Sequence, residues 1–378
     1  MIEPLQEVRI VDFSRVLAGP LATMLLADFG AQVLKVERPG VGDDTRAWGP
    51  PFDDCGEATY FHSINRNKVS SALDLGDPGD LGRARQLALE ADVLVENFRP
   101  GLMAEAGMDH ATLATANPGL VYCSVTGFGG RGAGAGMPGY DLLIQAVGGL
   151  MSLTGEPDEE PLKVGVALVD VICGAFAALG ILAALEQRRR TGRGQLVEVD
   201  LLSSLLAAMP AEGAALSLHD ELPGRSGNAD PCFAPCEVLR VGEEEMVLAI
   251  GDDDSFADLC DVLGAPTLAR DPRFATNRAR VEHREILRGR LTELLAARGI
   301  EDWLGPMRDR GLAAGRVSTL DQAFSTAADL GLDPTVSIPR HTGGPLRLTR
   351  NPIQMSRTPA SYRLAPPPLP TPSPEGAR

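Results

Sequence analysis

The chain has 378 residues, of which 44% are hydrophobic and 23% are charged, a composition typical of a globular protein with a large core. Its formal net charge of −16 at pH 7 argues against binding to nucleic acids or anionic membranes, because no basic excess is available to replace phosphate counterions. The six cysteines are scattered, and no signal peptide is visible at the N-terminus. We therefore expect a cytoplasmic protein without a disulfide framework.

Short apolar segments alternate with helical patterns over the first 130 residues. The predicted strands span residues 8–13, 32–37, 69–75, 93–96 and 120–126. The predicted helices among them span residues 17–29 and 81–91. Because strands that alternate with helices are typical of βαβ units, the sequence predicts an α/β fold with a mostly parallel sheet.

Further helices are predicted at residues 140–150, 171–190 and 201–216, with a strand at 196–200. The mostly apolar stretch 164–185 has the length of a membrane span, but Asp170 inside it would be costly in a bilayer. We therefore predict a buried helix and no association with a membrane.

A turn-rich stretch at residues 221–230 predicts a domain boundary. The large domain then spans residues 1–225, and a smaller α+β domain spans residues 226–332. In the smaller domain, strands are expected at 236–240 and 246–250, and helices at 255–263, 278–297, 300–310 and 320–328. The last residues, 333–378, are expected to be extended and to end in a proline-rich tail.

A glycine-rich segment follows the fifth predicted strand. Gly127, Gly129 and Gly132 match the pattern G-x-G-x-x-G, but further glycines and Pro138 follow where a dinucleotide-binding fingerprint would open a helix. Repeated glycines favour a mobile active-site loop instead. The five histidines show no metal-ligand spacing and the cysteines form no pair of pairs, so no metal site is predicted.

Three polar clusters lie close to predicted strands. Arg38 follows the second strand, the run NRNK occupies residues 65–68, and Asn97 and Arg99 follow the fourth strand. Ligands of α/β sheets bind beyond the carboxyl ends of the strands, and arginine is a good anchor for anions. Each cluster also fits a solvated surface, but together they predict one crevice for an anionic ligand.

Asp170 lies in the apolar segment VGVALVDVICGAF. The position suits an ordinary helix N-cap, where the carboxylate accepts backbone N–H groups. It also suits a carboxylate held in apolar surroundings near a helix N-terminus, where low solvation raises its reactivity as a nucleophile. The two interpretations are compatible.

Several longer motifs resemble those of the family III CoA-transferases, also called the CaiB/BaiF family. The matching segments are VLAGPLATMLLADFGAQVLKVERPGVGDDTR, NRNK, ADVLVENFRPG, VTGFG, PGYDLLIQAVGGLMSLTGEPD, PLKVGVALVDVICG, RRTGRGQLVEVDLL and DPRFATNRARVEHRE. They occur in this order over nearly the whole chain. The resemblance implies a Rossmann-like large domain, a small domain, a C-terminal return to the large domain, and an interlocked homodimer.

The resemblance also implies the site. Asp170 stands where the family has its catalytic aspartate. The residues at positions that line the CoA and acyl site are Val16, Arg38, Leu73, Asn97 and Tyr140. Arg99 also lies in a matching motif, and we expect it to meet a CoA phosphate.

The implied reaction needs an acyl-CoA, a free carboxylic acid and no permanently bound cofactor. The carboxylate of Asp170 forms a mixed anhydride with the acyl group and then a thioester with CoA, which passes to the acceptor acid. Backbone N–H groups of the loop 127–136 are expected to shield the anhydride from water.

Departures from the family's patterns narrow the activity. Racemases of the family carry a histidine where this chain has Tyr140, so transfer is favoured over α-proton exchange. Leu17 replaces a polar residue of the formyl-type members, and a glycine run of their small domain is absent, so a dicarboxylate or another small organic acid is the expected substrate. The alternatives are a 2-methylacyl-CoA racemase, a non-catalytic acyl-CoA-binding protein and a nicotinamide-dependent oxidoreductase.

Overall fold

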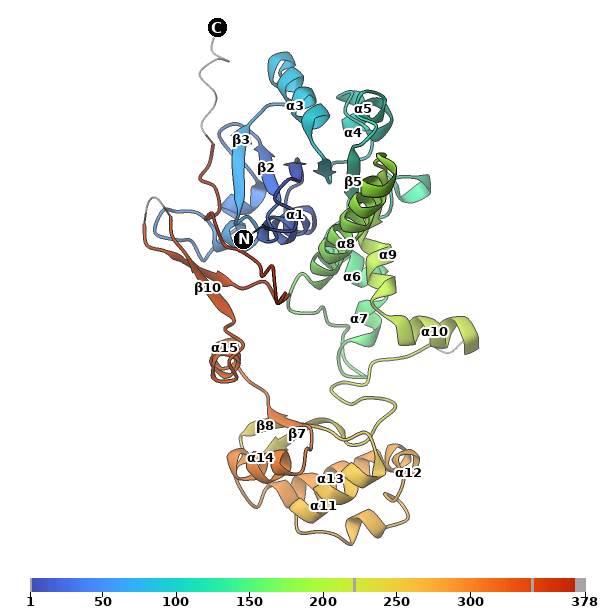
Figure 1. Cartoon of the computed structure of the whole chain (residues 1–378). Coiled ribbons are helices and arrows are strands. Elements are labelled where there is room, and N and C mark those ends of the chain that lie inside the picture. Colours follow the sequence, from blue (N-terminus) through green and yellow to red (C-terminus); the bar gives the residue numbers. More distant parts are fainter. Residues whose placement is uncertain (1, 220–221, 341–342, 371–378) are drawn as a thin grey trace. The chain divides into compact units, whose positions relative to one another are not determined.

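The computed structural model describes residues 2–219, 222–340 and 343–370 (Figure 1). The chain divides into two compact units, each described here by itself. The first unit consists of Met1–Leu150, Lys163–Leu222 and Asp333–Arg378, and the second consists of Met151–Leu162 and Pro223–Leu332.

A six-stranded parallel sheet forms the centre of the first unit. Its strands are β1 (Arg9–Asp12), β2 (Gln32–Glu37), β3 (Lys68–Ala72), β4 (Val93–Glu96), β5 (Val121–Thr126) and β6 (Leu196–Asp200). They are arranged in the order β3-β2-β1-β4-β5-β6, and every neighbouring pair is parallel. The α/β fold with a parallel sheet predicted from the sequence is thus confirmed. The chain order reverses between β1 and β4, and this is the point where sheets of this kind hold their ligands.

Helices cover both faces of the sheet, because successive strand residues point to opposite sides. In β1, Ile10 packs into one core cluster and Val11 into the other, and in β4 Val95 and Leu94 divide in the same way. The first face is covered by α1 (Ala18–Asp28), α6 (Asp141–Val147), α8 (Leu168–Thr191) and α9 (Leu201–Ala207). The second is covered by α3 (Pro78–Glu90), α4 (Leu102–Glu105) and α5 (His110–Ala116) (Figure 1).

Helix α8 is the apolar segment around Asp170. It is long and apolar enough to cross a membrane, and among the described residues only α9 and α10 (Pro210–His219), taken together as one bent pair, pass the same test. The helix packs against α1, β5 and β6, and Cys173, Ala177 and Ile181 are fully buried in the core of the first unit. This packing accounts for the apolar residues on the buried side of α8, whereas Leu179 and Leu182 on the same helix are exposed.

Two helices predicted as continuous are broken in the structure. The predicted helix 201–216 is α9 followed by α10, because Pro210 has no N–H to donate inside a helix and instead occupies the first turn of α10. The predicted helix 278–297 is α12 (Asn277–Glu282) followed by α13 (Arg284–Leu295). His283 ends the first of these helices and precedes the second.

The described part of the C-terminal segment docks onto the first unit through Asp28. This carboxylate is fully buried and accepts hydrogen bonds from Arg66, Asn67 and Asn351. Asn67 also binds the backbone of residues 361, 363 and 364. In the same segment, β10 (Thr335–Ile338) pairs with β11 (Leu346–Thr349) in an antiparallel arrangement. Residues 294 to 323 positions apart are therefore joined by one buried polar cluster.

The second unit is an α+β structure with its own core. Its antiparallel sheet has the order β7-β8-β9, with β7 (Cys236–Val241), β8 (Glu244–Ala249) and β9 (Ala314–Arg316). Its further helices include α11 (Asp253–Val262), α14 (Ile300–Asp309) and α15 (Leu320–Asp329). The side chains of Phe256, Leu291 and Trp303 are buried at the centre of this core.

Candidate active site

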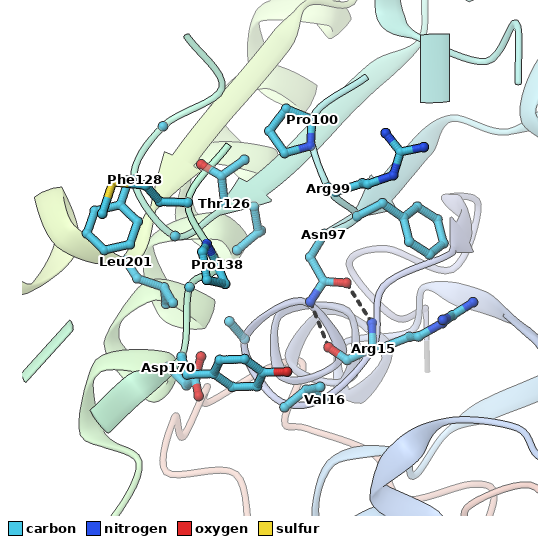
Figure 2. A pocket seen from close by; sticks show the side chains of 18 of the residues that line it. Arg15, Val16, Asn97, Arg99, Pro100, Thr126, Phe128, Pro138, Asp170 and Leu201 are labelled. Carbon is cyan, nitrogen blue, oxygen red and sulfur yellow. Dashed lines mark hydrogen bonds between the residues drawn. The ribbon is translucent and has the colours of Figure 1, made fainter. Parts of the chain in front are cut away.

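A cavity of about 610 Å³ opens at the carboxyl ends of β1, β4 and β5 (Figure 2). It therefore lies at the reversal of strand order, where the loops after β1 and β4 diverge. Its lining comes mainly from these loops, from the glycine-rich loop after β5 and from the first turn of α8, with Asp44 from the segment after β2 and Leu201 from α9. The lining side chains used below are Arg15, Val16, Asp44, Asn97, Phe98, Arg99, Phe128, Met137, Pro138, Tyr140 and Asp170.

Five of the residues expected at the site meet in this cavity. They are Asp170, Val16, Asn97, Arg99 and Tyr140. The other two are placed differently. Leu73 is 2% exposed and packs into the core on the second face of the sheet. Arg38 forms an ion pair with Asp44, which itself lines the cavity.

Asp170 occupies the first turn of α8, one side of the cavity (Figure 2). The N-cap of the helix is Ala167, so Asp170 is not the cap residue. The capping is done from α6, where Asp141 Oδ2 accepts the N–H groups of Val169 at 2.8 Å and Asp170 at 3.3 Å. Among the described residues, no hydrogen bond occupies the carboxylate of Asp170, which leaves it available to a ligand.

Burial, followed by the charge of Asp141, raises the pKa of Asp170 to about 7. A carboxyl group with this pKa is about half ionised at neutral pH. Burial and then the charges of Asp170, Asp141 and Asp43 raise the pKa of Tyr60 to about 12. Tyr60 therefore stays protonated at the edge of a group of carboxylates.

Cationic side chains lie toward the other side of the cavity. Arg15 is half-buried, and its guanidinium lies 5.0 Å from the ring centre of Phe98. Burial and the neighbouring charge of Arg38 lower the pKa of Arg15, and the charges of Asp44, Asp43 and Glu37 offset this only in part. No carboxylate of the described residues forms an ion pair with Arg15. Arg99 is 63% exposed and paired with Glu105. An anionic group bound beside Arg15 would relieve the repulsion between Arg15 and Arg38.

The glycine-rich loop is pinched where it starts and ends. A Cβ atom on Gly139 would lie 2.3 Å from the Cα of Gly127, so only glycines allow the two backbones to approach in this way. The backbone of Gly127 also accepts the N–H of Leu202 at 3.1 Å. Between these two glycines, Phe128, Met137 and Pro138 reach the cavity.

The NRNK run does not contribute to the cavity, contrary to expectation. Arg66 and Asn67 bind Asp28, and Lys68 is fully buried against Asp12, with 3.1 Å between Nζ and Oδ2. Their charges are already compensated inside the protein. Among the described residues, no group of three or more His, Cys, Asp or Glu side chains is arranged to hold a metal ion.

The sequence of this chain matches a known protein family. The family model of CoA-transferase family III matches residues 5–371. The chain belongs to CoA-transferase family III. The resemblance seen in the motifs is thereby confirmed, and the protein is an enzyme of the CoA-transferase class.

Relatives of this CoA-transferase share its length as well as its sequence. The succinate–glutarate CoA-transferase of Agrobacterium fabrum is 38% identical, and the alignment covers 97% of this chain and 93% of that protein. The acetyl-CoA:oxalate CoA-transferase of Acetobacter aceti is 38% identical over 93% of this chain and 89% of that protein. A crystal structure of a CaiB/BaiF family protein from Brucella suis superposes with a TM-score of 0.88 at 38% identity, covering 98% of this chain and 97% of that one.

Two residues of the site were missed from the sequence. Arg15 follows β1 as Arg38 follows β2, so its place after a strand was a usable signal. Asp141 directly follows Tyr140, but its contact with the N-terminus of α8 joins residues 28 and 29 positions apart. Only the packing of α6 against α8 brings them together.

Proposed function

We propose that this enzyme transfers CoA between carboxylic acids through covalent intermediates on Asp170. The supporting observation is an ionisable carboxylate in the cavity that no described residue engages by a hydrogen bond. Its position in the first turn of α8 places the helix N-terminus behind it, and this end of a helix favours the carboxylate form. Burial opposes ionisation and leaves the carboxylate poorly solvated, which favours attack on a thioester.

Each step exchanges one activated carboxyl group for another. The carboxylate of Asp170 attacks the donor thioester and expels CoA thiolate, which leaves an acyl–aspartyl anhydride. The thiolate then attacks the aspartyl carbonyl, releasing the donor acid and forming an aspartyl–CoA thioester. The acceptor carboxylate and the same thiolate repeat the two attacks in reverse order, so the CoA leaves on the acceptor and Asp170 is regenerated.

Two parts of the cavity suit the two parts of a CoA thioester. Arg15, with Arg38 behind it and Arg99 at the surface, provides positive charge for the nucleotide phosphates. The apolar and backbone groups of Phe128, Pro138 and the loop glycines lie nearer to the reacting carboxylate and exclude water from the anhydride.

A small dicarboxylic acid is the acceptor or donor that we propose. Several relatives are named for such substrates, including succinate, glutarate and oxalate. Tyr140 lines the cavity where a racemase of the family would carry histidine, so the chain lacks that proton-transfer group. These observations favour transfer over epimerisation.

We also propose that the enzyme is an interlocked homodimer, as the family resemblance implies. Large apolar side chains are exposed on α6, α8 and α9 of the first unit, among them Leu142, Val147, Leu179 and Leu206. Exposed apolar groups gathered on neighbouring helices mark an interaction surface. Light scattering coupled to size exclusion is expected to give the mass of two chains.

One mass-spectrometric assay in deuterated water tests the proposed activity. The enzyme is mixed with a panel of acyl-CoA thioesters, including succinyl-CoA and a 2-methylacyl-CoA, and with unlabelled carboxylic acids, and the mass of every CoA thioester is measured over time. New thioesters without deuterium are expected from the wild type and not from D170N, an isosteric variant without the nucleophilic carboxylate. Deuterium gain on a 2-methylacyl-CoA without new thioesters would instead identify an epimerase.

A further inference from the structure

The turn that follows β1 has a strained backbone. Val16 has φ = 69°, in the left-handed region, where a side chain branched at Cβ is disfavoured. The other two non-glycine residues in this region, among those described, are Asn67 and Asp333. Both are residue types that tolerate the left-handed conformation far better than valine. A valine held there needs contacts that fix the turn.

Asn97 supplies such contacts from the loop after β4. Its Oδ1 accepts the N–H of Arg15 at 2.8 Å, and its Nδ2 donates to the carbonyl of Arg15 at 2.7 Å (Figure 2). The side-chain amide therefore grips both backbone groups of the residue before Val16. One of its two N–H donors and one lone pair of its oxygen are thus used inside the protein rather than on a ligand.

A buried ion pair holds the turn from its other side. Asp43 Oδ1 accepts the N–H of Val16 at 3.4 Å, and its other oxygen lies 2.8 Å from Nζ of Lys35. Both side chains of this pair are fully buried, and Lys35 Nζ also donates to the carbonyl of Ser14 at 2.9 Å. The backbone is thus held immediately before, at and after Arg15.

We propose that Asn97 is a positioning residue that locks the turn 15–17 in its strained form and so presents Arg15 to the CoA thioester. The proposal rests on the proposed function, because it names the ligand of the same cavity. The sequence predicts that Asn97 lines the CoA site. The proposal is instead that Asn97 acts on the ligand indirectly, through the backbone of Arg15. The fixed backbone strengthens binding of an anion to the Arg15 guanidinium, because less conformational entropy is lost when the anion binds.

A double-mutant cycle distinguishes a positioning role from direct contact with CoA. Calorimetry measures the affinity for CoA of the wild type, N97A, V16G and the double variant. We expect N97A to weaken binding about tenfold, because Val16 then relaxes out of the left-handed region. In the V16G background, where this region carries no steric penalty, the same change is expected to cost about threefold or less.

The matched control is N117A. The Asn117 amide also binds two backbone carbonyls, those of Leu89 and Ala91, but it lies outside the cavity. N117A is expected to lower thermal stability without changing the affinity for CoA. The milder N97S is expected to show the same dependence on residue 16, and it replaces N97A in the cycle where N97A does not fold.

Two results would overturn the proposal. One is an equal loss of CoA affinity from N97A in both backgrounds, which would mean that Asn97 contacts CoA directly. The other is unchanged affinity in N97A. If the wild type itself does not bind CoA, the proposed function fails rather than the role of Asn97. In kinetics, the loss is expected in KM for the thioester, with kcat changed by about twofold or less.

Discussion

The pH dependence of the reaction follows from the environment of Asp170. Its carboxylate is the proposed nucleophile, and burial together with the charge of Asp141 raises its pKa to about 7. The ionised fraction is then about one half at pH 7, about a tenth at pH 6 and about nine tenths at pH 8. Activity is therefore expected to rise with pH, and kcat/KM, which reports the free enzyme, should be about tenfold lower at pH 6 than at pH 8.

The variant D141N separates the two causes of this raised pKa. Asparagine keeps an oxygen that accepts the N–H groups of Val169 and Asp170, but it removes the negative charge. The pKa of Asp170 is expected to fall, so the acidic limb of the profile moves to lower pH. Activity at pH 6 then rises relative to activity at pH 8.

The assay is the initial rate of thioester exchange at limiting thioester between pH 5 and pH 9. Tyr60, with a pKa of about 12, does not titrate in this window. A wild-type profile that is flat from pH 6 to pH 8 would refute the assignment of a pKa near 7 to the nucleophile. A D141N profile that superimposes on that of the wild type would show that the charge of Asp141 does not act on Asp170.

Four further substitutions test other parts of the account. G139A places a methyl group 2.3 Å from the Cα of Gly127, so it is expected to destabilise the fold by about 1–3 kcal/mol and to raise KM for the thioester. An unchanged melting temperature and an unchanged KM would show that the loop opens freely. R66L leaves Asp28 without its buried cation, so the free energy of unfolding measured with denaturant is expected to fall by about 3 kcal/mol, and residues 343–370 become open to proteolysis. Resistance to proteolysis equal to that of the wild type would contradict the docking role. R15L is expected to weaken CoA binding about tenfold in calorimetry, and R99A is expected to have a smaller effect because Arg99 is exposed. A larger loss of affinity in R99A than in R15L would place the CoA phosphates at Arg99.

The sheet was predictable because its signal is local. Most of its strands are short apolar runs next to helical segments, although β3, with the sequence KVSSA, is not, and this alternation is visible without any knowledge of tertiary contacts. Asp170 and Tyr140 could be identified from sequence motifs, because both lie in segments shared with the family. Pro210 marked the break between α9 and α10 in the sequence itself, although the apolar pattern there was continuous.

The partners of polar residues were not predictable in the same way. Arg66 has the sequence context of a surface cation, yet it is buried against Asp28, 38 positions away, and against the carbonyl of Thr349, 283 positions away. A run of polar letters does not show whether its charges face solvent or an internal counterion. Leu73 shows the same limit for apolar residues, because a motif position does not tell which face of the sheet a side chain occupies.

The strained turn lies between these cases. Its motif was visible, but nothing in the letters SRVLAG indicates that Val16 is left-handed. That conformation depends on Asn97 and Asp43, which come from loops after two other strands. Long-range hydrogen bonds can impose a backbone shape that local preference opposes.

Oxygen transfer from the acceptor acid to Asp170 tests the covalent mechanism most directly. The enzyme is turned over in ordinary water with succinyl-CoA and an acceptor acid labelled with ¹⁸O in its carboxyl groups. The enzyme is then digested, and the mass of the peptide containing Asp170 is measured by mass spectrometry. Because the acceptor carboxylate attacks the aspartyl carbonyl and leaves one oxygen behind, we predict ¹⁸O on Asp170 after turnover. New thioester accompanied by an unlabelled Asp170 would contradict the mechanism.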